Sequence, residues 1–150
     1  MDEEYMRIAL DEAQSAFDED EVPIGAVVVK DGEIISRAHN LRETLKDATA
    51  HAEIIAIRRA SKVLGGWRLI DCELFVTIEP CPMCAGAIMQ SRLKRLVFGA
   101  YDDKAGACGS VMDITGNPLL NHRIEVVSGI LEYECSSIMK DYFKQKRTSF

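Results

Sequence analysis

The stretch LFVTIEPCPMCAGAIMQSRLKRLVFGA, residues 74–100, decides the fold class. Its apolar run Leu74–Ile78 predicts a strand. Pro82 lies where the first turn of a helix tolerates proline, so we expect a helix from there to about Ser91. Leu96–Ala100 then predicts another strand. A helix between two buried strands is typical of the α/β class.

The chain before this stretch predicts a helix and a hairpin. Apolar residues recur at three- and four-residue spacing near the N-terminus and indicate an amphipathic helix. They are Met6, Ala9, Ala13, Ala16 and Phe17. Ile24–Val29 and Glu33–Ala38 read as strands, and they flank Lys30-Asp31-Gly32, a sequence that favours a tight turn because Asp-Gly tolerates positive φ.

Three more elements complete the expected order. Thr49 is a candidate N-cap for a helix that runs to about Leu64 and stops at Gly65–Gly66. Ile124–Val127 predicts a strand, and Leu131 to about Lys146 a long closing helix. The whole order predicts a three-layer α/β/α sandwich, with a mixed sheet of about five strands and helices on both faces.

Length and composition favour one globular domain over residues 1–150. A hydrophobic fraction of 47% with 28% charged residues excludes wholesale disorder. No apolar run approaches the roughly 18 residues that a bilayer span needs, and acidic residues dominate the N-terminus, where a secretory signal would be basic. We therefore expect a cytoplasmic protein with no membrane partner.

The charge is unevenly distributed along the chain. There are 18 Lys and Arg against 24 Asp and Glu, a net of −6, which argues against a general nucleic-acid coat protein. Residues 1–21 hold nine acids against Arg7 alone, so the rest of the chain carries a net of +2. Residues 138–150 carry +3. A local basic patch for nucleic acid therefore remains open.

Two short motifs predict a metal site. Cys81-Pro82-Met83-Cys84 opens a helix after a strand, and His51-Ala52-Glu53 opens another helix upstream. Side chains lean toward a helix N-terminus, so Cys81 and Cys84 can converge on one point, with His51 as a third ligand. Structural zinc sites are normally closed by four protein ligands, whereas three leave a position for a water that zinc acidifies. The set of three ligands therefore favours a catalytic zinc site over a structural one.

Glu53 is the candidate catalytic residue. It lies two residues from His51, and zinc with two thiolates hardly needs a further anion, so a general acid and base is the better assignment. The plain alternative is a carboxylate that complements the helix dipole.

The remaining cysteines raise one competing possibility. In a cytosolic chain five cysteines favour metal or catalytic use over disulfides. Cys72 and Cys135 read as small core residues. Cys108, in a glycine-rich loop, is the most plausible fourth ligand, and a closed four-ligand site would make the protein a structural zinc module that binds RNA without chemistry.

His51-Ala52-Glu53 with Glu79-Pro80-Cys81-Pro82-Met83-Cys84 resembles the signature of the zinc-dependent cytidine and deoxycytidylate deaminase superfamily. Further segments resemble the bacterial tRNA-specific adenosine deaminases in register from about Met6 to Arg147. These segments are Glu21–Val28, Asn40, His51–Ile54, Cys84–Ala87, Phe98–Ala100, Gly109–Asp113 and Asn121–Arg123. Tyr101 departs from that pattern, since some members carry a basic residue there.

The resemblance implies a cytidine deaminase-like fold and hydrolytic deamination of adenosine to inosine at the wobble position of a tRNA anticodon. It implies one Zn²⁺ per subunit held by His51, Cys81 and Cys84, and Glu53 as proton shuttle. It also implies a homodimer that binds the anticodon loop of tRNA, with no DNA partner expected.

By the same resemblance, five residues are expected to contact the RNA substrate. They are Asn40, Asp102, Phe143, Lys146 and Arg147. Without it, Asn40 would read as a turn former beside His39, and Ile138, Met139, Tyr142 and Phe143 as an apolar helix face that packs mostly in the core. The alternative enzyme is a free-base or nucleoside deaminase acting on guanine or cytosine.

Overall fold

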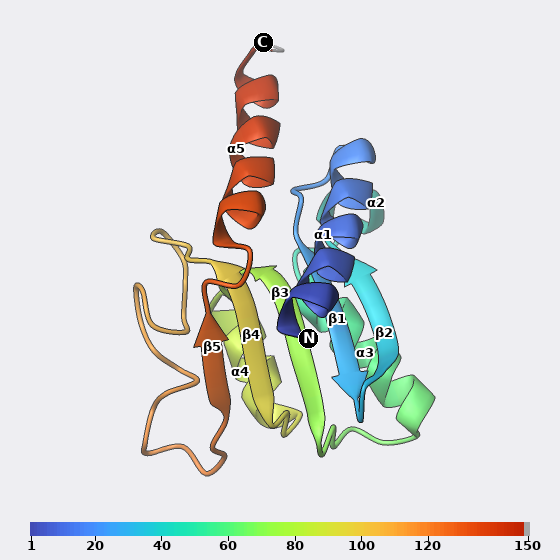
Figure 1. Cartoon of the computed structure of the whole chain (residues 1–150), viewed down its shortest axis with the longest axis vertical. Coiled ribbons are helices and arrows are strands. Elements are labelled where there is room, and N and C mark those ends of the chain that lie inside the picture. Colours follow the sequence, from blue (N-terminus) through green and yellow to red (C-terminus); the bar gives the residue numbers. More distant parts are fainter. Residues whose placement is uncertain (149–150) are drawn as a thin grey trace.

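The computed structural model describes residues 1–148 and contains one mixed sheet with helices on both sides (Figure 1). In chain order the elements are α1 (Asp2–Asp18), β1 (Gly25–Lys30), β2 (Glu33–His39), α2 (Arg42–Leu45), α3 (Ala52–Leu64), β3 (Cys72–Ile78), α4 (Pro82–Gln90), β4 (Arg95–Ala100), β5 (Glu125–Ser128) and α5 (Glu132–Thr148). Within the described residues, no helix combines the length and apolarity needed to cross a membrane.

The sheet has the strand order β2-β1-β3-β4-β5. β1 pairs antiparallel with both β2 and β3, whereas β3, β4 and β5 are parallel. The β1–β2 turn is the expected tight hairpin, because Asp31 and Gly32 have φ of 51° and 77°. The predicted mixed sheet of five strands is confirmed.

The strands bury both faces, which gives two cores. In β1, Ala26 and Val28 pack toward α3 and α4, while Val27 and Val29 pack toward α1 and α5. Figure 1 shows α1 in front of the sheet, α3 and α4 behind it, and α5 rising beyond the upper edge of the sheet. Cys135 and Met139 of α5 pack in the same core as α1. The predicted α/β/α sandwich is therefore confirmed, and the helices that carry the metal motifs share one face.

The predicted N-cap residue of α3 is wrong. Thr49 does not cap it, because its hydroxyl and backbone N–H both bind Asp47 Oδ1, at 2.7 and 2.8 Å. This local carboxylate satisfies Thr49 in a turn before the helix. His51 is the N-cap residue instead, with φ −76° and ψ 152°. Gly65 ends α3 in the left-handed conformation, as expected.

α1 is held against the sheet at two places. Arg95 on β4 forms ion pairs with Asp2 at the start of α1 (2.6 Å), with Glu73 on β3 (2.8 Å) and with Glu125 on β5 (3.3 Å). Further along, Gly25 at the start of β1 lies directly against the α1 backbone. An added Cβ there would overlap the carbonyl oxygen of Ala9 and lie 2.6 Å from the backbone nitrogen of Ala13.

Gly25→Ala should therefore lower the free energy of unfolding by about 1–3 kcal/mol, since a close-packed interface has to shift to admit the methyl group. Chemical denaturation of the metal-loaded protein measures the change. Gly66→Ala is the matched control, because nothing lies within 4 Å of its Cβ position and we expect a change within about 0.5 kcal/mol. Equal stability of the two variants would contradict this account of α1 packing.

Candidate metal centre and active site

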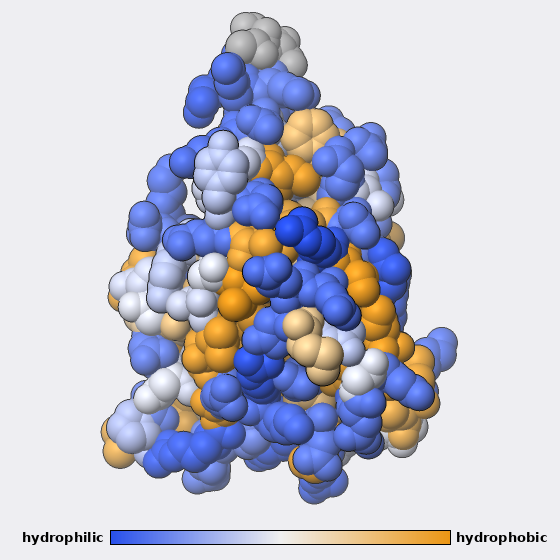
Figure 2. Space-filling view, in the orientation of Figure 1, coloured by the Kyte–Doolittle hydropathy of each residue, from blue (hydrophilic) through white to orange (hydrophobic). Residues whose placement is uncertain are grey.

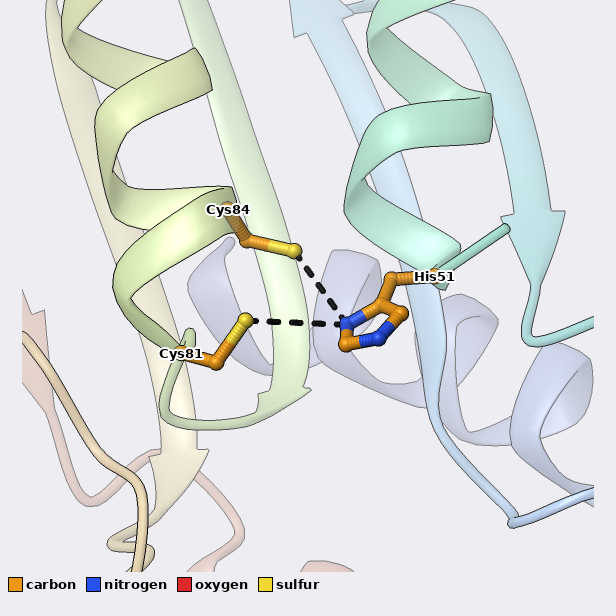
Figure 3. Close-up of side chains that lie close together, drawn as sticks. All are labelled: His51, Cys81 and Cys84. Carbon is orange, nitrogen blue, oxygen red and sulfur yellow. Dashed lines mark hydrogen bonds between the residues drawn. The ribbon is translucent and has the colours of Figure 1, made fainter. Parts of the chain in front are cut away.

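His51, Cys81 and Cys84 point toward one another from the N-termini of α3 and α4 (Figure 3). His51 Nδ1 lies 3.7 Å from Cys81 Sγ and 3.5 Å from Cys84 Sγ. Tetrahedral zinc with ordinary Zn–S and Zn–N bonds places such nitrogen and sulfur atoms about 3.6 Å apart. The three donor atoms therefore fit a zinc ion without rearrangement.

The positions of the ligands on their helices explain this convergence. His51 is the N-cap of α3 and Cys81 is the N-cap of α4, while Cys84 lies in the first turn of α4. Pro82 at the first helical position of α4 fixes the start of that helix. The positive ends of both helix dipoles therefore face the same point and favour thiolate ligands there.

The surroundings shift the pKa values of the two thiols in opposite directions. A hydrogen bond from the Cys84 thiol, joined by one with His51, lowers the pKa of Cys81 to about 4. The same bond with Cys81, together with burial, raises the pKa of Cys84 above its usual range. Of the two thiols, Cys81 is therefore the one whose surroundings favour the thiolate.

Cys108 does not join the cluster. Among residues 1–148, His51, Cys81 and Cys84 form the group of three or more potential ligands close enough to share a metal ion. Cys108 is buried, and desolvation raises the pKa of its thiol to about 12. Cys72 and Cys135 are buried, as expected. The described residues thus offer three ligands and leave one tetrahedral position for water or substrate.

Glu53 lies beside the cluster in the first turn of α3 and is 4% exposed. Burial raises the pKa of Glu53 to about 7. A carboxyl with a pKa near neutrality can take and return a proton at physiological pH, as general acid and base catalysis requires.

One cavity of about 570 Å³ joins the cluster to surface residues. His51, Glu53 and Cys81 lie in its wall together with Asp102 and Phe143, so the structure brings two of the five predicted RNA contacts to the metal site. Phe143 is 42% exposed, whereas the neighbouring Tyr142 is buried. Of the four residues expected to form an apolar face packed mostly in the core, only Tyr142 is buried, whereas Ile138 and Met139 are partly buried. Phe143 lines the cavity, as expected for an RNA contact.

Asn40 lies next to this cavity. It borders a small recess of about 40 Å³ shared with His51 and Glu53. Its Oδ1 accepts a hydrogen bond from the backbone N–H of Arg42 at 3.2 Å, and its Nδ2 donates to the Val22 carbonyl at 3.5 Å. The turn-forming interpretation of Asn40 is therefore realised in the structure, at a position that also adjoins the site.

Lys146 and Arg147 lie away from the cavity, on the part of α5 that runs on beyond the sheet (Figure 1). Lys146 forms an ion pair with Asp20 at 2.7 Å. Arg147 is exposed. Figure 2 shows that hydrophilic residues cover most of this end of the helix.

Three basic residues lie in the cavity wall: Arg42, Lys104 and Lys140. Lys140 belongs to the basic segment 138–150, which the sequence offered as a patch for nucleic acid. Arg42 and Lys104 were missed by the sequence reasoning. Arg42 follows Asn40 by two positions and Lys104 follows Asp102 by two, and this proximity is the one signal that could have pointed to them.

The comparisons with known proteins place the chain in a family. A model of MafB19-like deaminases matches residues 1–147. The tRNA-specific adenosine deaminase of Bacillus subtilis (strain 168) is 52% identical over 146 residues, which cover 97% of this chain and 91% of that protein. The chain belongs to the tRNA-specific adenosine deaminase family.

Solved structures agree with this placement. A structure from studies of A-to-I editing by tRNA:A34 deaminases at the wobble position of transfer RNA has a TM-score of 0.87 and 48% identity, and the match covers 90% of this chain and 98% of that one. The structure of a guanine deaminase from Bacillus subtilis has a TM-score of 0.65 and 35% identity, and the match covers 97% of this chain and 93% of that one. The tRNA deaminase is thus closer in both structure and sequence than this guanine deaminase.

Cys84→Ala should lose most of the bound zinc and lower thermal stability, because metal binding contributes to the stability of the folded state. Cys108→Ala, which removes another buried thiol, should keep a full equivalent of metal. Elemental analysis of the two purified variants measures the difference. Loss of zinc from Cys108→Ala would instead support a structural zinc site with Cys108 as the fourth ligand.

Proposed function

We propose that this protein catalyses the hydrolytic deamination of adenosine to inosine at the wobble position of a tRNA anticodon. The observation that carries the proposal is the buried Glu53 carboxyl beside the His51, Cys81 and Cys84 donor atoms, in the wall of one open cavity. Membership of the tRNA-specific adenosine deaminase family and likeness to a tRNA:A34 deaminase structure support adenosine as the target.

The resident metal in this proposal is zinc, one ion per subunit, held by His51 Nδ1 and the sulfurs of Cys81 and Cys84. The donor set of one imidazole and two thiolates suits zinc, and the spacing of the donor atoms matches its bond lengths. When bound, zinc supplies the Lewis acidity that makes water a nucleophile at neutral pH.

Glu53 moves the protons in this reaction. It takes one proton from the attacking water as the water oxygen bonds to C6 of adenine, and it delivers that proton to N1. It then carries the second water proton from the new C6 hydroxyl to the amino nitrogen. The C6–N bond breaks, ammonia leaves, and the oxygen remains as the C6 carbonyl of inosine. Glu53 ends in the protonation state in which it began.

An anticodon loop suits the geometry of the cavity. Its bases are unpaired, so turning one into the cavity costs less than opening a duplex. Arg42, Lys104 and Lys140 in the wall can meet phosphates, and Phe143 offers an aromatic face for stacking. We propose that Asn40 and Asp102 contact RNA at the cavity, while Lys146 and Arg147 reach it farther along α5.

We further propose that the protein works in the cytoplasm as a homodimer. Several exposed apolar side chains on α4 and in the loop after β4 are candidates for burial between subunits. They are Met83, Val111, Met112 and Leu119. A second subunit would also double the number of basic residues near an RNA loop.

Glu53→Gln should reduce the rate of inosine formation by about 10²–10⁴-fold and leave the zinc content unchanged, because the amide cannot take a proton from water. Mass spectrometry of tRNA with adenosine at the wobble position measures inosine, and elemental analysis measures zinc. Persistent activity, or activity lost only together with zinc, would contradict the assigned role of Glu53.

The same assay separates the alternative enzyme. Wild-type protein is offered the tRNA, free guanine and free cytosine in parallel. Turnover of a free base without inosine in the tRNA would overturn the proposal in favour of a free-base deaminase, the activity of the 35% identical structural relative.

Arg147→Ala should weaken tRNA binding and make the slope of log affinity against log salt concentration shallower by about 0.7, the value for one lost phosphate contact on a single strand. Lys146→Ala should have a smaller effect, because Asp20 already holds that ammonium group at 2.7 Å. Arg7→Ala, which removes an exposed side chain of α1, is the control and should leave the slope unchanged. Equal slopes for Arg147→Ala and wild type would remove Arg147 from the interface.

A further inference from the structure

Glu79 is a buried carboxylate whose hydrogen bonds all go to one loop. It is 3% exposed and lies between the end of β3 and Cys81. Its Oε1 accepts from the Asp102 backbone N–H at 3.0 Å and from the Ser110 hydroxyl at 2.7 Å. Its Oε2 accepts from the backbone N–H groups of Cys108 and Ser110 at 2.9 and 3.1 Å. The segment 102–110, here called the 102–110 loop, thus folds around this carboxylate.

Glu79 has no part in the metal cluster or in the proton transfer. It is only two residues before Cys81, yet the metal-capable group among the described residues does not include it. Although it borders the cavity, both oxygens are already occupied by loop donors. Glu79 is therefore committed to the loop rather than to a metal ion or a proton transfer.

Two further features fit the loop to this anion. The Ala107 backbone N–H donates to the Pro80 carbonyl at 2.8 Å, next to Glu79 in the chain. Gly106 lies so close that an added Cβ would overlap the Glu79 carboxyl group. The loop can therefore approach the carboxylate only with glycine at position 106.

The loop in turn forms one wall of the cavity, through residues 102–105. Asp102 Oδ1 accepts from the backbone N–H groups of Lys104 and Ala105 at 3.0 and 3.2 Å, so these wall residues move with Asp102. The backbone N–H of Asp102 is itself held by Glu79. A continuous chain of hydrogen bonds thus runs from the buried carboxylate to the wall.

We propose that Glu79 is a positioning residue for the RNA substrate: it fixes the 102–110 loop as the cavity wall that binds the nucleotides at the target adenosine. This rests on the proposed function. The wall touches substrate before and during the reaction, so weakening it removes binding common to the ground and transition states. Loss of Glu79 therefore raises KM for tRNA far more than it lowers kcat.

The main test is Glu79→Gln, because the amide keeps one acceptor oxygen and turns an NH₂ group toward the backbone donors. We expect KM for tRNA to rise about 10-fold or more, with kcat within about 3-fold and zinc content unchanged. Gly106→Ala should reproduce this pattern with the carboxylate chemically intact, since the methyl group displaces it. Ser110→Ala removes only the hydroxyl bonds to Glu79 and the Asp102 carbonyl, so its KM should lie between those of wild type and Glu79→Gln.

Glu73→Gln is the matched control. It makes the same chemical change on β3, in a carboxylate that binds Arg95 rather than a cavity loop, and should leave KM and kcat unchanged. Hydrogen exchange gives a readout independent of activity: the amides of Cys108 and Ser110 should exchange faster in Glu79→Gln and normally in Glu73→Gln.

The outcomes separate the two proposals. If wild type makes no inosine, the proposed function fails, whereas the exchange data still report on the loop. A drop in kcat at unchanged KM, or loss of zinc from Glu79→Gln, would overturn the positioning role in favour of a role at the metal centre. If Glu79→Gln does not fold, the variants Ser110→Ala and Gly106→Ala provide the test. A KM for tRNA equal to that of wild type in both variants would overturn the proposal.

Discussion

The convergence of two helix N-termini on one point is the constraint on which the rest of this structure depends. The donor atoms of His51, Cys81 and Cys84 lie within 4.8 Å of one another although they come from two helices. This requires α3 and α4 to begin at the same edge of the sheet and to pack on the same face. β1 pairs antiparallel with β3, and β3 pairs parallel with β4. These pairings determine how the segments that connect the strands run, and therefore where α3 and α4 begin. Helix α1 and the first turns of α5 cover the other face, and the later α5 residues Met139, Lys140 and Phe143 form part of the cavity wall at this edge.

Three buried glutamates around the cavity show how environment decides the chemistry of a carboxyl group. Burial dominates at Glu53 and raises its pKa to about 7, so this group can exchange protons. At Glu79 and Glu21 burial also acts to raise the pKa, but hydrogen bonds prevail and lower it. Glu21 accepts from the backbone N–H groups of Glu43 and Thr44, at 3.1 and 2.6 Å, and so holds α2. Environment thus leaves Glu53 able to exchange a proton, whereas Glu21 and Glu79 hold segments that carry cavity residues.

The sequence predicted most elements and the convergence of Cys81 with Cys84 because both depend on local spacing. Cysteines three residues apart at a helix start can face one point, and apolar periodicity marks the strands. The approach of His51 to this pair depends instead on how α3 and α4 pack on the sheet, and it was predicted from the pairing of the two motifs. The start of α3 was wrong because Asp47 competes for Thr49, a choice that neither residue type reveals alone. α2 was missed because the buried partner that holds it, Glu21, lies on a distant segment. The cavity wall was only partly predictable, since α5 and the 102–110 loop meet there only in three dimensions.

The acidic N-terminal segment and the basic end of α5 are not independent, although they lie at opposite ends of the chain. Asp20 holds Lys146 at 2.7 Å and also accepts a hydrogen bond from the Tyr142 hydroxyl at 3.3 Å. The carboxylate of Asp20 and the ammonium of Lys146 are both exposed, and ion pairs of this kind are weak and screened by salt. If Lys146 contacts RNA as proposed, a phosphate therefore replaces Asp20 as its partner at small cost. In this proposal the Asp20 carboxylate competes with any polyanion for Lys146, and a tRNA loop that also binds at the cavity displaces it through its additional contacts.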